Sequence, residues 1–389
     1  MQLKQTWRWL GDNDPITLKD ILQTGASGIV TALHHVPHGD LWTIDEIQKR
    51  KNAIEAAGLT WDVVESVTVH ESIKTQTGDY KTYIEQYKET LRNLAACNIK
   101  TVTYNFMPVA DWTRTNLDFI MPDGSRALYF NWFDLAVFDI FILKRKNAED
   151  DYSEEVLNEA EKRFKLYSPQ QLKQISFTIR FGIPGEKKLS VGEMKKKIDT
   201  YKKINHSLLR EHLKYFLEQI TPVCEEHTIK LALHPDDPPF DIFGLPRIVS
   251  TAEDVQYILS SVKSKENGFC FCTGSFGASS KNNLVEMIKM IDERIHFVHL
   301  RNTKRDEYGN FFEADHLNGD TDMYAVVAEI LAIQQKLNDP ISFRPDHGHV
   351  MLDDVNKKTN PGYSCIGRMR GLAELRGLML GISRANNWQ

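Results

Sequence analysis

The sequence predicts an α/β fold: a (β/α)8 TIM barrel with a helical insertion after its fourth strand. Short runs rich in β-forming residues alternate with helical runs eight times along the 389 residues, which is typical of a parallel sheet whose strands are joined by helices. Eight repeats favour a closed barrel over an open doubly wound sheet, which is the alternative. A nucleotide-binding sheet is disfavoured because no G-x-G-x-x-G follows the first strand and no P-loop motif occurs.

The first half of the predicted barrel contains four strands and the helices between them. The helix expected over residues 43–57 has well-defined ends. Thr43 can cap its N-terminus, Glu46 stands at capping-box distance, and Gly58 follows its last turn. The strands are expected at residues 5–10, 28–33, 60–66 and 100–106, and the other helices at 18–23 and 80–97.

About a hundred residues, 107–206, then interrupt the alternation. They contain an aromatic, apolar segment at 130–143, charged helices at 153–166 and 191–204, and a Gly/Pro turn at 182–185. Loops of that length without structure of their own are uncommon. Residues 107–206 are therefore predicted to form a helical insertion, or cap subdomain, within a single barrel domain that spans residues 1–389.

The second half of the chain resumes the strand–helix alternation with four more strands. A helix precedes the first of them, and a long helix closes the chain. The strands are expected at residues 229–234, 268–272, 295–300 and 341–343, and the helices at 208–226, 251–262, 284–291, 322–337 and 366–382.

Composition excludes several classes of protein. The net charge of −5 argues against nucleic acid or an anionic membrane as a partner. No stretch approaches the ~20 apolar residues that a membrane span needs, and residues 1–7 lack the apolar core of a signal peptide. The five cysteines are odd in number and unpatterned, so free thiols in a reducing cytoplasm are expected.

Ligand-type side chains follow the last four predicted strands. In a barrel of this kind the chemistry lies at the C-terminal ends of the strands. Two imidazoles, a thiolate and a carboxylate could meet at one cation there, and this mixed set suits a divalent transition metal better than Mg²⁺ or Ca²⁺. The four residues are His234, Cys272, His299 and Asp346. Cys270 is left out, on the expectation that the two sulfurs of the C-x-C motif point to opposite faces of the strand.

Each of these four residues also has an ordinary explanation. A single histidine at a strand end is usually only hydrogen-bonded, Cys272 could be a buried apolar side chain, and Asp346 could cap a turn. Their shared position in the repeat favours one site over four separate coincidences.

Further polar residues at strand ends are candidates for binding a substrate. An arginine near a metal suits an anionic substrate, because guanidinium pairs with a carboxylate in bidentate fashion. The acidic loop at 234–239 is stiffened by its prolines, and its aspartates could orient the site or face solvent. The candidate substrate-binding residues are Arg8, His34, Asn105, Arg301 and Arg344.

Several longer motifs occur between the predicted helices. They are QTWRW at 5–9, TALHH at 31–35, YNFMP at 104–108, DWTRT at 111–115, HPDDPP at 234–239, CTGS at 272–275, RPDHGH at 344–349 and NPGYS at 360–364. With these motifs the sequence resembles the bacterial mannonate dehydratase family, and the similarity runs from end to end, insertion included.

The resemblance implies a fold, a reaction and roles for particular residues. It implies a xylose-isomerase-like barrel that dehydrates D-mannonate to 2-keto-3-deoxy-D-gluconate in hexuronate (glucuronate) breakdown, with Mn²⁺ or Fe²⁺ as the metal. It also implies that His234, Cys272, His299 and Asp346 bind the metal. The acid/base residues that it implies are His347 and Tyr363.

The chemistry of this reaction suits these residue types. The C2 proton of an aldonate is very weakly acidic, and its removal builds up negative charge that a divalent metal stabilises by several kcal/mol. A base must take this proton and an acid must protonate the departing C3 hydroxyl, each transfer typically contributing ~10²–10⁴-fold. Histidine suits a base near neutral pH, and tyrosine, with an ordinary pKa of about 10, suits an acid.

Two other functions compete with the dehydratase. A metal-dependent sugar isomerase could use the same barrel, but the thiolate and the nearby arginines count against it. A non-catalytic sugar-acid binding protein would not need a metal beside a His/Tyr pair. The assignment of base and acid between His347 and Tyr363 stays open, as does the arginine that meets the substrate carboxylate. A homodimer is expected because barrels of this kind often pair through their helices.

Overall fold

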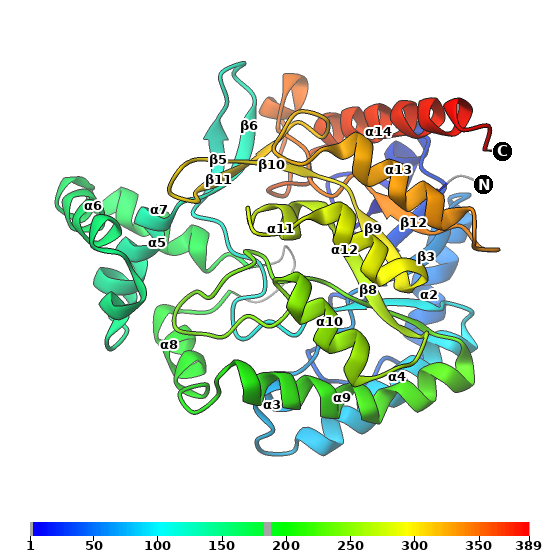
Figure 1. The fold of residues 1–389 in the computed structure, drawn as a ribbon, viewed down its shortest axis with the longest axis horizontal. Helices are drawn as coiled ribbons and strands as arrows, with labels where there is room; N and C mark the ends of the chain where they lie inside the picture. Colours follow the sequence, from blue (N-terminus) through cyan, green and yellow to red (C-terminus); the bar gives the residue numbers. More distant parts are fainter. Residues whose placement is uncertain (1–2, 183–187, 389) are drawn as a thin grey trace.

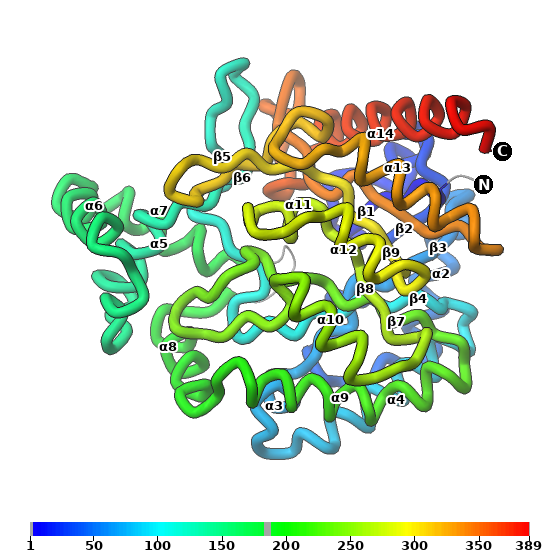
Figure 2. The backbone as a smooth tube through the Cα atoms, viewed as in Figure 1, coloured from blue at the N-terminus to red at the C-terminus, as the bar shows by residue number. Residues whose placement is uncertain are grey.

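The computed structural model describes residues 3–182 and 188–388, and its centre is a closed barrel of eight parallel strands (Figures 1 and 2). The predicted barrel is confirmed. Around the barrel the strands follow the order β1-β12-β9-β8-β7-β4-β3-β2. Their bounds are β1 Lys4–Arg8, β2 Gly28–Thr31, β3 Thr60–Glu65, β4 Thr101–Tyr104, β7 Lys230–Leu233, β8 Asn267–Cys272, β9 Ile295–His299 and β12 Ser342–Arg344.

Helices surround the barrel and bury the outward faces of its strands. Their bounds are α1 Leu18–Gln23, α2 Ile44–Ala56, α4 Tyr80–Ala96, α9 His206–His227, α10 Ala252–Ser261, α12 Leu284–Ile291, α13 Met323–Gln334 and α14 Cys365–Ala385. Every helix predicted between barrel strands is present. In α2 the Thr43 side chain accepts from the backbone N–H of Glu46 as expected, but the Glu46 carboxylate pairs with His35 at 2.8 Å and leaves the capping box half formed.

The barrel interior is filled by a separate cluster of buried side chains. One comes from each of five strands: Val30, Val63, Ala232, Cys270 and Phe297. Successive side chains of a strand alternate between its faces, so residues two positions further along also point inward. This alternation places the next inward side chains at the C-terminal ends of the strands, which form the barrel mouth.

The insertion between β4 and β7 contains the predicted helices and more. Helices α5, α6 and α7 lie together at the left end of the molecule, away from the barrel (Figure 1). The elements are β5 Asn116–Ile120, β6 Arg126–Phe130, α5 Trp132–Ala136, the π-helix η1 Val137–Leu143, η2 Ala148–Asp151, α6 Glu154–Leu166, α7 Pro169–Ile179 and α8 Val191–Asp199. The hairpin β5–β6 was not predicted. The predicted turn at 182–185 lies outside the described residues except for Gly182.

A second sheet, antiparallel and four-stranded, joins the insertion to the loop after β9. Its order is β10-β11-β6-β5, with β10 at Asn302–Arg305 and β11 at Phe311–Ala314. The register pairs Phe311 with Phe130 and Phe312 with Tyr129. The sequence did not predict this sheet or the short elements α3 Glu71–Thr75, α11 Thr273–Gly277, η3 Asp292–Arg294 and η4 Leu352–Asn356. Among the described helices, none combines the length and the apolar character that crossing a membrane would require.

Candidate active site

One inward-pointing layer of side chains gathers the site at the barrel mouth. Counting two residues on from the interior cluster gives Glu65 on β3, His234 after β7, Cys272 on β8 and His299 on β9. The register confirms that these strand ends are level, because Cys272 and Arg344 are both Cα partners of His299. Strand alternation therefore brings together residues that are far apart in the sequence.

The predicted metal ligands fall in two overlapping groups that share His299, one of His234, Cys270 and His299 and the other of Cys272, His299 and Asp346. His234 Nε2 lies 3.2 Å from His299 Nδ1. Cys272 Sγ lies 3.6 Å from Asp346 Oδ2, and Asp346 Oδ1 lies 3.8 Å from His299 Nδ1. Within each group all candidate ligand atoms are within 4.8 Å of one another. Each of the four sequence-predicted residues thus belongs to at least one of these groups, and neither group holds all four.

Hydrogen bonds and close polar contacts hold both imidazoles in place. His234 Nδ1 donates to the carbonyl oxygen of Pro235 at 2.7 Å, so its Nε2 keeps a lone pair. His299 Nε2 lies 3.3 Å from Glu65 Oε2 and 3.1 Å from Arg344 Nε, which donates to it. Partners of this kind orient a metal-binding imidazole.

The exclusion of Cys270 on the ground of opposite faces is wrong. Side chains two positions apart lie on the same face of a strand, and Cys270 groups with His234 and His299 as closely as Cys272 does with His299 and Asp346. The two thiols differ in their surroundings. Ser275 donates to Cys272 Sγ from its N–H at 3.4 Å and its hydroxyl at 3.2 Å, whereas burial and the nearby Glu65 raise the pKa of Cys270 well above its usual value. The two hydrogen-bond donors at Cys272 Sγ favour it over Cys270 as a metal ligand.

This donor set fits a divalent transition metal. Imidazole, thiolate and carboxylate groups converge from four strand ends, and the hydrogen bond from His234 Nδ1 leaves a lone pair on its Nε2. Burial would raise the pKa of Asp346, but the charges of Arg344 and its neighbours hold it well below the ordinary value. The carboxylate is consequently ionised and able to bind a cation.

A cavity of ≈ 540 Å³, measured to its open mouth, lies over these groups. Seven sequence-predicted site residues line it: Arg8, Asn105, His234, Arg344, Asp346, His347 and Tyr363. Asp111 and Trp112, from the start of the insertion, also line it. His34 instead lines an adjoining cavity, which shares Arg8 and Ser66 with the first.

His347 and Tyr363 stand side by side in the cavity wall. Their ring centroids are 5.1 Å apart at 80°, an edge-to-face contact. Trp112 packs against His347 in the same manner at 5.9 Å. Burial raises the pKa of the Tyr363 phenol, with Arg8 and Arg344 opposing that shift. The phenol is therefore protonated near neutral pH.

The three candidate arginines differ in how fully they are engaged. Arg344 donates to Glu65 through Nε and Nη2 and pairs with Asp346 through Nη1 at 2.6 Å. Arg8 pairs with Glu65 through Nη1, while its Nε is buried without a hydrogen-bond partner in the described part of the chain.

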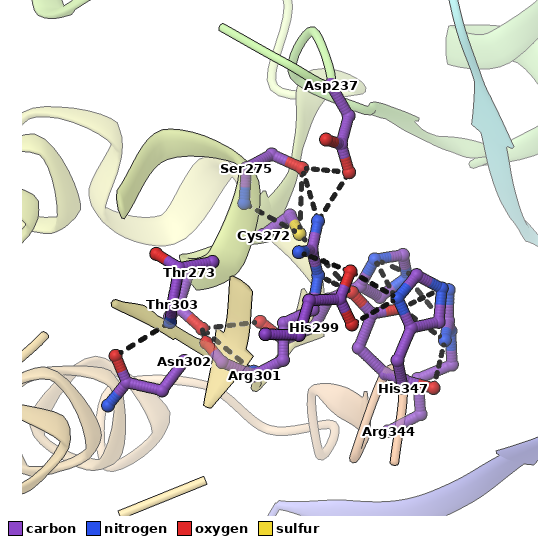
Figure 3. A network of polar contacts seen from close by, with 12 residues as sticks. Asp237, Cys272, Thr273, Ser275, His299, Arg301, Asn302, Thr303, Arg344 and His347 are labelled. Atoms are coloured by element: carbon purple, nitrogen blue, oxygen red, sulfur yellow. Dashed lines mark hydrogen bonds and ion pairs between the residues drawn. The ribbon is translucent and has the colours of Figure 1, made fainter. Parts of the chain in front are cut away.

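Arg301 is as fully engaged as Arg344 and is not among the described residues that line the cavity. Figure 3 shows it beside Asp237 and Ser275. Its Nε donates to Asp346 at 2.5 Å, its Nη1 to Glu313 at 3.0 Å and its Nη2 to Asp237. All three nitrogens of its guanidinium are thus held by carboxylates of the protein.

Sequence reasoning missed two residues of the ion-pair network around Arg301. They are Arg114 and Glu313. Both are buried, and Arg114 bonds to Asp237 at 2.6 Å and to Glu313 at 2.8 Å. Arg114 lies within one of the motifs, but Glu313 belongs to no motif and follows no barrel strand. Asp237, whose role was open between orienting the site and facing solvent, is buried and orients Arg114 and Arg301.

Comparison of the sequence with known proteins identifies one family. The family model described as D-mannonate dehydratase (UxuA) matches residues 3–389. The chain is 50% identical over 387 residues to the mannonate dehydratase of Marinomonas sp. (strain MWYL1), covering 98% of this chain and 99% of that protein. It is 47% identical over 385 residues to the mannonate dehydratase of Saccharophagus degradans, covering 97% of each.

Solved structures agree with the sequence comparison. The crystal structure of mannonate dehydratase from Streptococcus suis serotype 2 is 34% identical, with a TM-score of 0.80 over 99% of this chain and 96% of that one. A xylose isomerase domain protein from Planctomyces limnophilus has a TM-score of 0.51 at 10% identity over 99% of each chain. The second likeness concerns the fold alone.

Proposed function

The chain belongs to the mannonate dehydratase family, and from that premise we propose which side chains at the barrel mouth carry out the reaction. The protein is a hydro-lyase that removes water from D-mannonate to give 2-keto-3-deoxy-D-gluconate, and the alternative of a sugar isomerase is not supported. One observation carries the proposal. Two imidazoles, a thiolate and a carboxylate lie close to one another, and two of these residues, His234 and Asp346, line one cavity with a His/Tyr pair.

We propose His234, Cys272, His299 and Asp346 as the ligands of Mn²⁺ or Fe²⁺. The soft thiolate together with imidazoles suits these transition metals, whereas Mg²⁺ prefers oxygen ligands. When bound, the ion supplies Lewis-acid stabilisation, worth several kcal/mol, of the charge that grows on the substrate carboxylate as C2 loses its proton.

Arg8 is proposed to bind the substrate carboxylate. It lines the cavity and keeps an unpartnered Nε in the described part of the chain, whereas the guanidinium nitrogens of Arg344 and Arg301 are engaged by carboxylates of the protein. Arg344 and Arg301 instead hold Asp346 from two sides, at 2.6 and 2.5 Å. Side chains that do not bind the metal themselves commonly orient a metal ligand in this way.

Tyr363 is proposed as the general acid and His347 as the general base. Burial raises the pKa of Tyr363, so the phenol holds the proton that the departing C3 hydroxyl needs. His347 then takes the C2 proton, and its Nε2 lies 3.8 Å from Asp346 Oδ1, next to the atoms that would bind the substrate. Asn105, whose amide donates to Asp111 at 2.7 and 2.8 Å, is proposed to present its oxygen to a substrate hydroxyl.

Residues 107–206 are proposed to act as a cap subdomain within the single barrel domain. Asp111 and Trp112 at its start line the cavity, so the insertion contributes to excluding water from the site. The homodimer, the cytoplasmic location and the place in hexuronate breakdown stay predictions. Light scattering during gel filtration would test the dimer.

The test is removal and return of the metal. We expect the chelated protein to form no 2-keto acid from D-mannonate, and Mn²⁺ or Fe²⁺ to restore product formation. Failure to form product with any divalent metal would contradict the proposal. Conversion of mannose to fructose would favour the isomerase instead.

A further inference from the structure

The carboxylate of Glu313 lies against the ring of His347. Its two oxygens are 3.0 and 2.9 Å from His347 Nδ1. Glu313 belongs to β11 of the antiparallel sheet and is buried. An ionised carboxylate only accepts hydrogen bonds, so Nδ1 must carry the proton, and in the neutral ring Nε2 carries the lone pair.

This arrangement aims the basic nitrogen of His347 at the site. His347 lines the cavity, and Nε2 lies on the side of Asp346, at 3.8 Å from its Oδ1. Because the ring is hydrogen-bonded on one edge and packed between Trp112 and Tyr363, rotation would break these contacts.

The carboxylate of Glu313 is itself firmly held. Burial would raise its pKa, but His347 and the guanidinium groups of Arg301 and Arg114 lower it far below the ordinary value. Arg114 Nη2 and Arg301 Nη1 lie 2.8 and 3.0 Å from its Oε1. The acceptor for His347 is therefore a fixed, ionised group.

The backbone of β11 is anchored to the same loop. His349 Nε2 lies 2.7 Å from the carbonyl oxygen of Glu313, so the loop that carries His347 and the strand that carries Glu313 are bonded twice. On the other side, β11 pairs with β6 of the insertion. The sheet thus supports the contact from outside the barrel.

We propose that Glu313 is a positioning residue for the proton transfer: it fixes the tautomer and the orientation of His347, and the antiparallel sheet delivers it to the barrel mouth. The inference rests on the proposed role of His347 as base. Glu313 is not among the described residues that line the cavity, so it acts through His347 and not on the substrate.

The first test replaces Glu313 alone. Glu313→Ala removes the acceptor, and we expect kcat to fall roughly 10–100-fold while KM is unchanged, because no substrate contact is lost. Glu313→Gln should recover part of the loss, since its amide oxygen can still accept from Nδ1. A wild-type kcat in Glu313→Ala would overturn the proposal.

The second test is a double-mutant cycle with His347→Ala. If Glu313 acts through His347, then Glu313→Ala lowers kcat no further once the imidazole is gone. An equal fractional loss in both backgrounds would overturn the proposal. Full kcat in His347→Ala itself would instead contradict the proposed base, so the two failures are distinguishable.

Asp237→Asn is the matched control, because it also weakens the carboxylate contacts of Arg114 and Arg301. Asp237 binds the same two arginines as Glu313 but makes no hydrogen bond to His347. We therefore expect its effect on kcat, whatever its size, to be the same in both His347 backgrounds. Metal content and melting temperature are measured for every variant. Loss of the metal from Glu313→Gln would overturn the proposal, because the effect would then pass through Arg301 and Asp346.

Discussion

The barrel mouth and the antiparallel sheet beside it both supply charged side chains to one site, but by different means. At the mouth, each parallel strand contributes its last inward residue, and strand register alone makes these residues neighbours. Glu313 in the sheet and Arg114, which precedes its strand β5, are 199 positions apart and meet because the insertion pairs with the loop after β9. The mouth holds the groups that we propose to touch substrate or metal, and the sheet holds Glu313, which is hydrogen-bonded to one of them, His347.

This difference predicts two kinds of mutational effect. Removal of a mouth residue should abolish a chemical step, whereas removal of a sheet residue should loosen a group that remains present. The variants below compare a mouth residue with a matched residue elsewhere, beginning with the largest expected loss.

The two inward-facing cysteines of β8 give the largest expected contrast. Cys272→Ser should lose the metal and with it several kcal/mol of stabilisation, or on the order of 10³–10⁴-fold in kcat. Cys270→Ser should keep the metal, because burial raises the pKa of that thiol and disfavours its thiolate. Elemental analysis after dialysis measures the metal. If Cys270→Ser loses the metal and Cys272→Ser keeps it, the thiolate ligand is Cys270.

Two tyrosines, one in each region, provide the next comparison. Tyr363→Phe at the mouth should lower kcat roughly 10²–10⁴-fold with bound metal unchanged, because the proton for the C3 hydroxyl is lost. Tyr129→Phe in β6 removes a hydroxyl that only accepts from Asn131, so kcat should stay at the wild-type level. Both rates follow from 2-keto acid formation. A wild-type rate in Tyr363→Phe would remove that residue from the mechanism.

The same difference explains what the sequence could predict. The eight barrel strands and the helices between them follow from local hydrophobic patterns, and the strand-end rule then placed His234, Cys272, His299 and Asp346 together. Applying the two-residue period to Cys270 as well would have included it, and would have marked Glu65 as their neighbour.

The antiparallel sheet could not be predicted in this way. Its strands are four or five residues long, lie within loops, and are stabilised by pairing between distant segments. Glu313 therefore carried no local signal, although its contacts decide the orientation of His347. The role of a residue such as Glu313 depends on pairing between strands that lie in two distant loops. Local patterns in one sequence do not predict that pairing.

Substitutions of Arg8 and Arg301 compare an arginine proposed to bind substrate with one whose guanidinium is bonded to carboxylates of the protein. Arg8→Lys should raise KM for D-mannonate, because Lys cannot pair with a carboxylate in bidentate fashion, with a loss in kcat/KM of about 10–100-fold from one or two charge-assisted hydrogen bonds. Arg301→Lys should instead lower the melting temperature, since it breaks bonds to buried carboxylates. Steady-state kinetics and thermal unfolding separate the two. A raised KM in Arg301→Lys with unchanged stability would reverse the assignment.

His34 provides the smallest expected effect and tests whether a strand-end position alone confers function. It follows β2, lines the adjoining cavity, and both its ring nitrogens lack a partner in the described part of the chain. Burial, with help from Arg8 and Arg50, lowers its pKa to about 3. The folded state therefore binds fewer protons than the unfolded state, so this contribution to stability is present above about pH 6.5 and is lost as pH falls toward 3.

His34→Phe removes this titration and should flatten the acid side of the stability curve. Each pH unit below about 6.5 costs the wild type at most about 1.4 kcal/mol through this group, so the free energy of unfolding should fall less between pH 7 and 5.5 in the variant. Urea unfolding at the two pH values measures the difference. A raised KM for D-mannonate in His34→Phe, with an unchanged slope, would return His34 to the substrate-binding residues and extend the barrel mouth into the adjoining cavity.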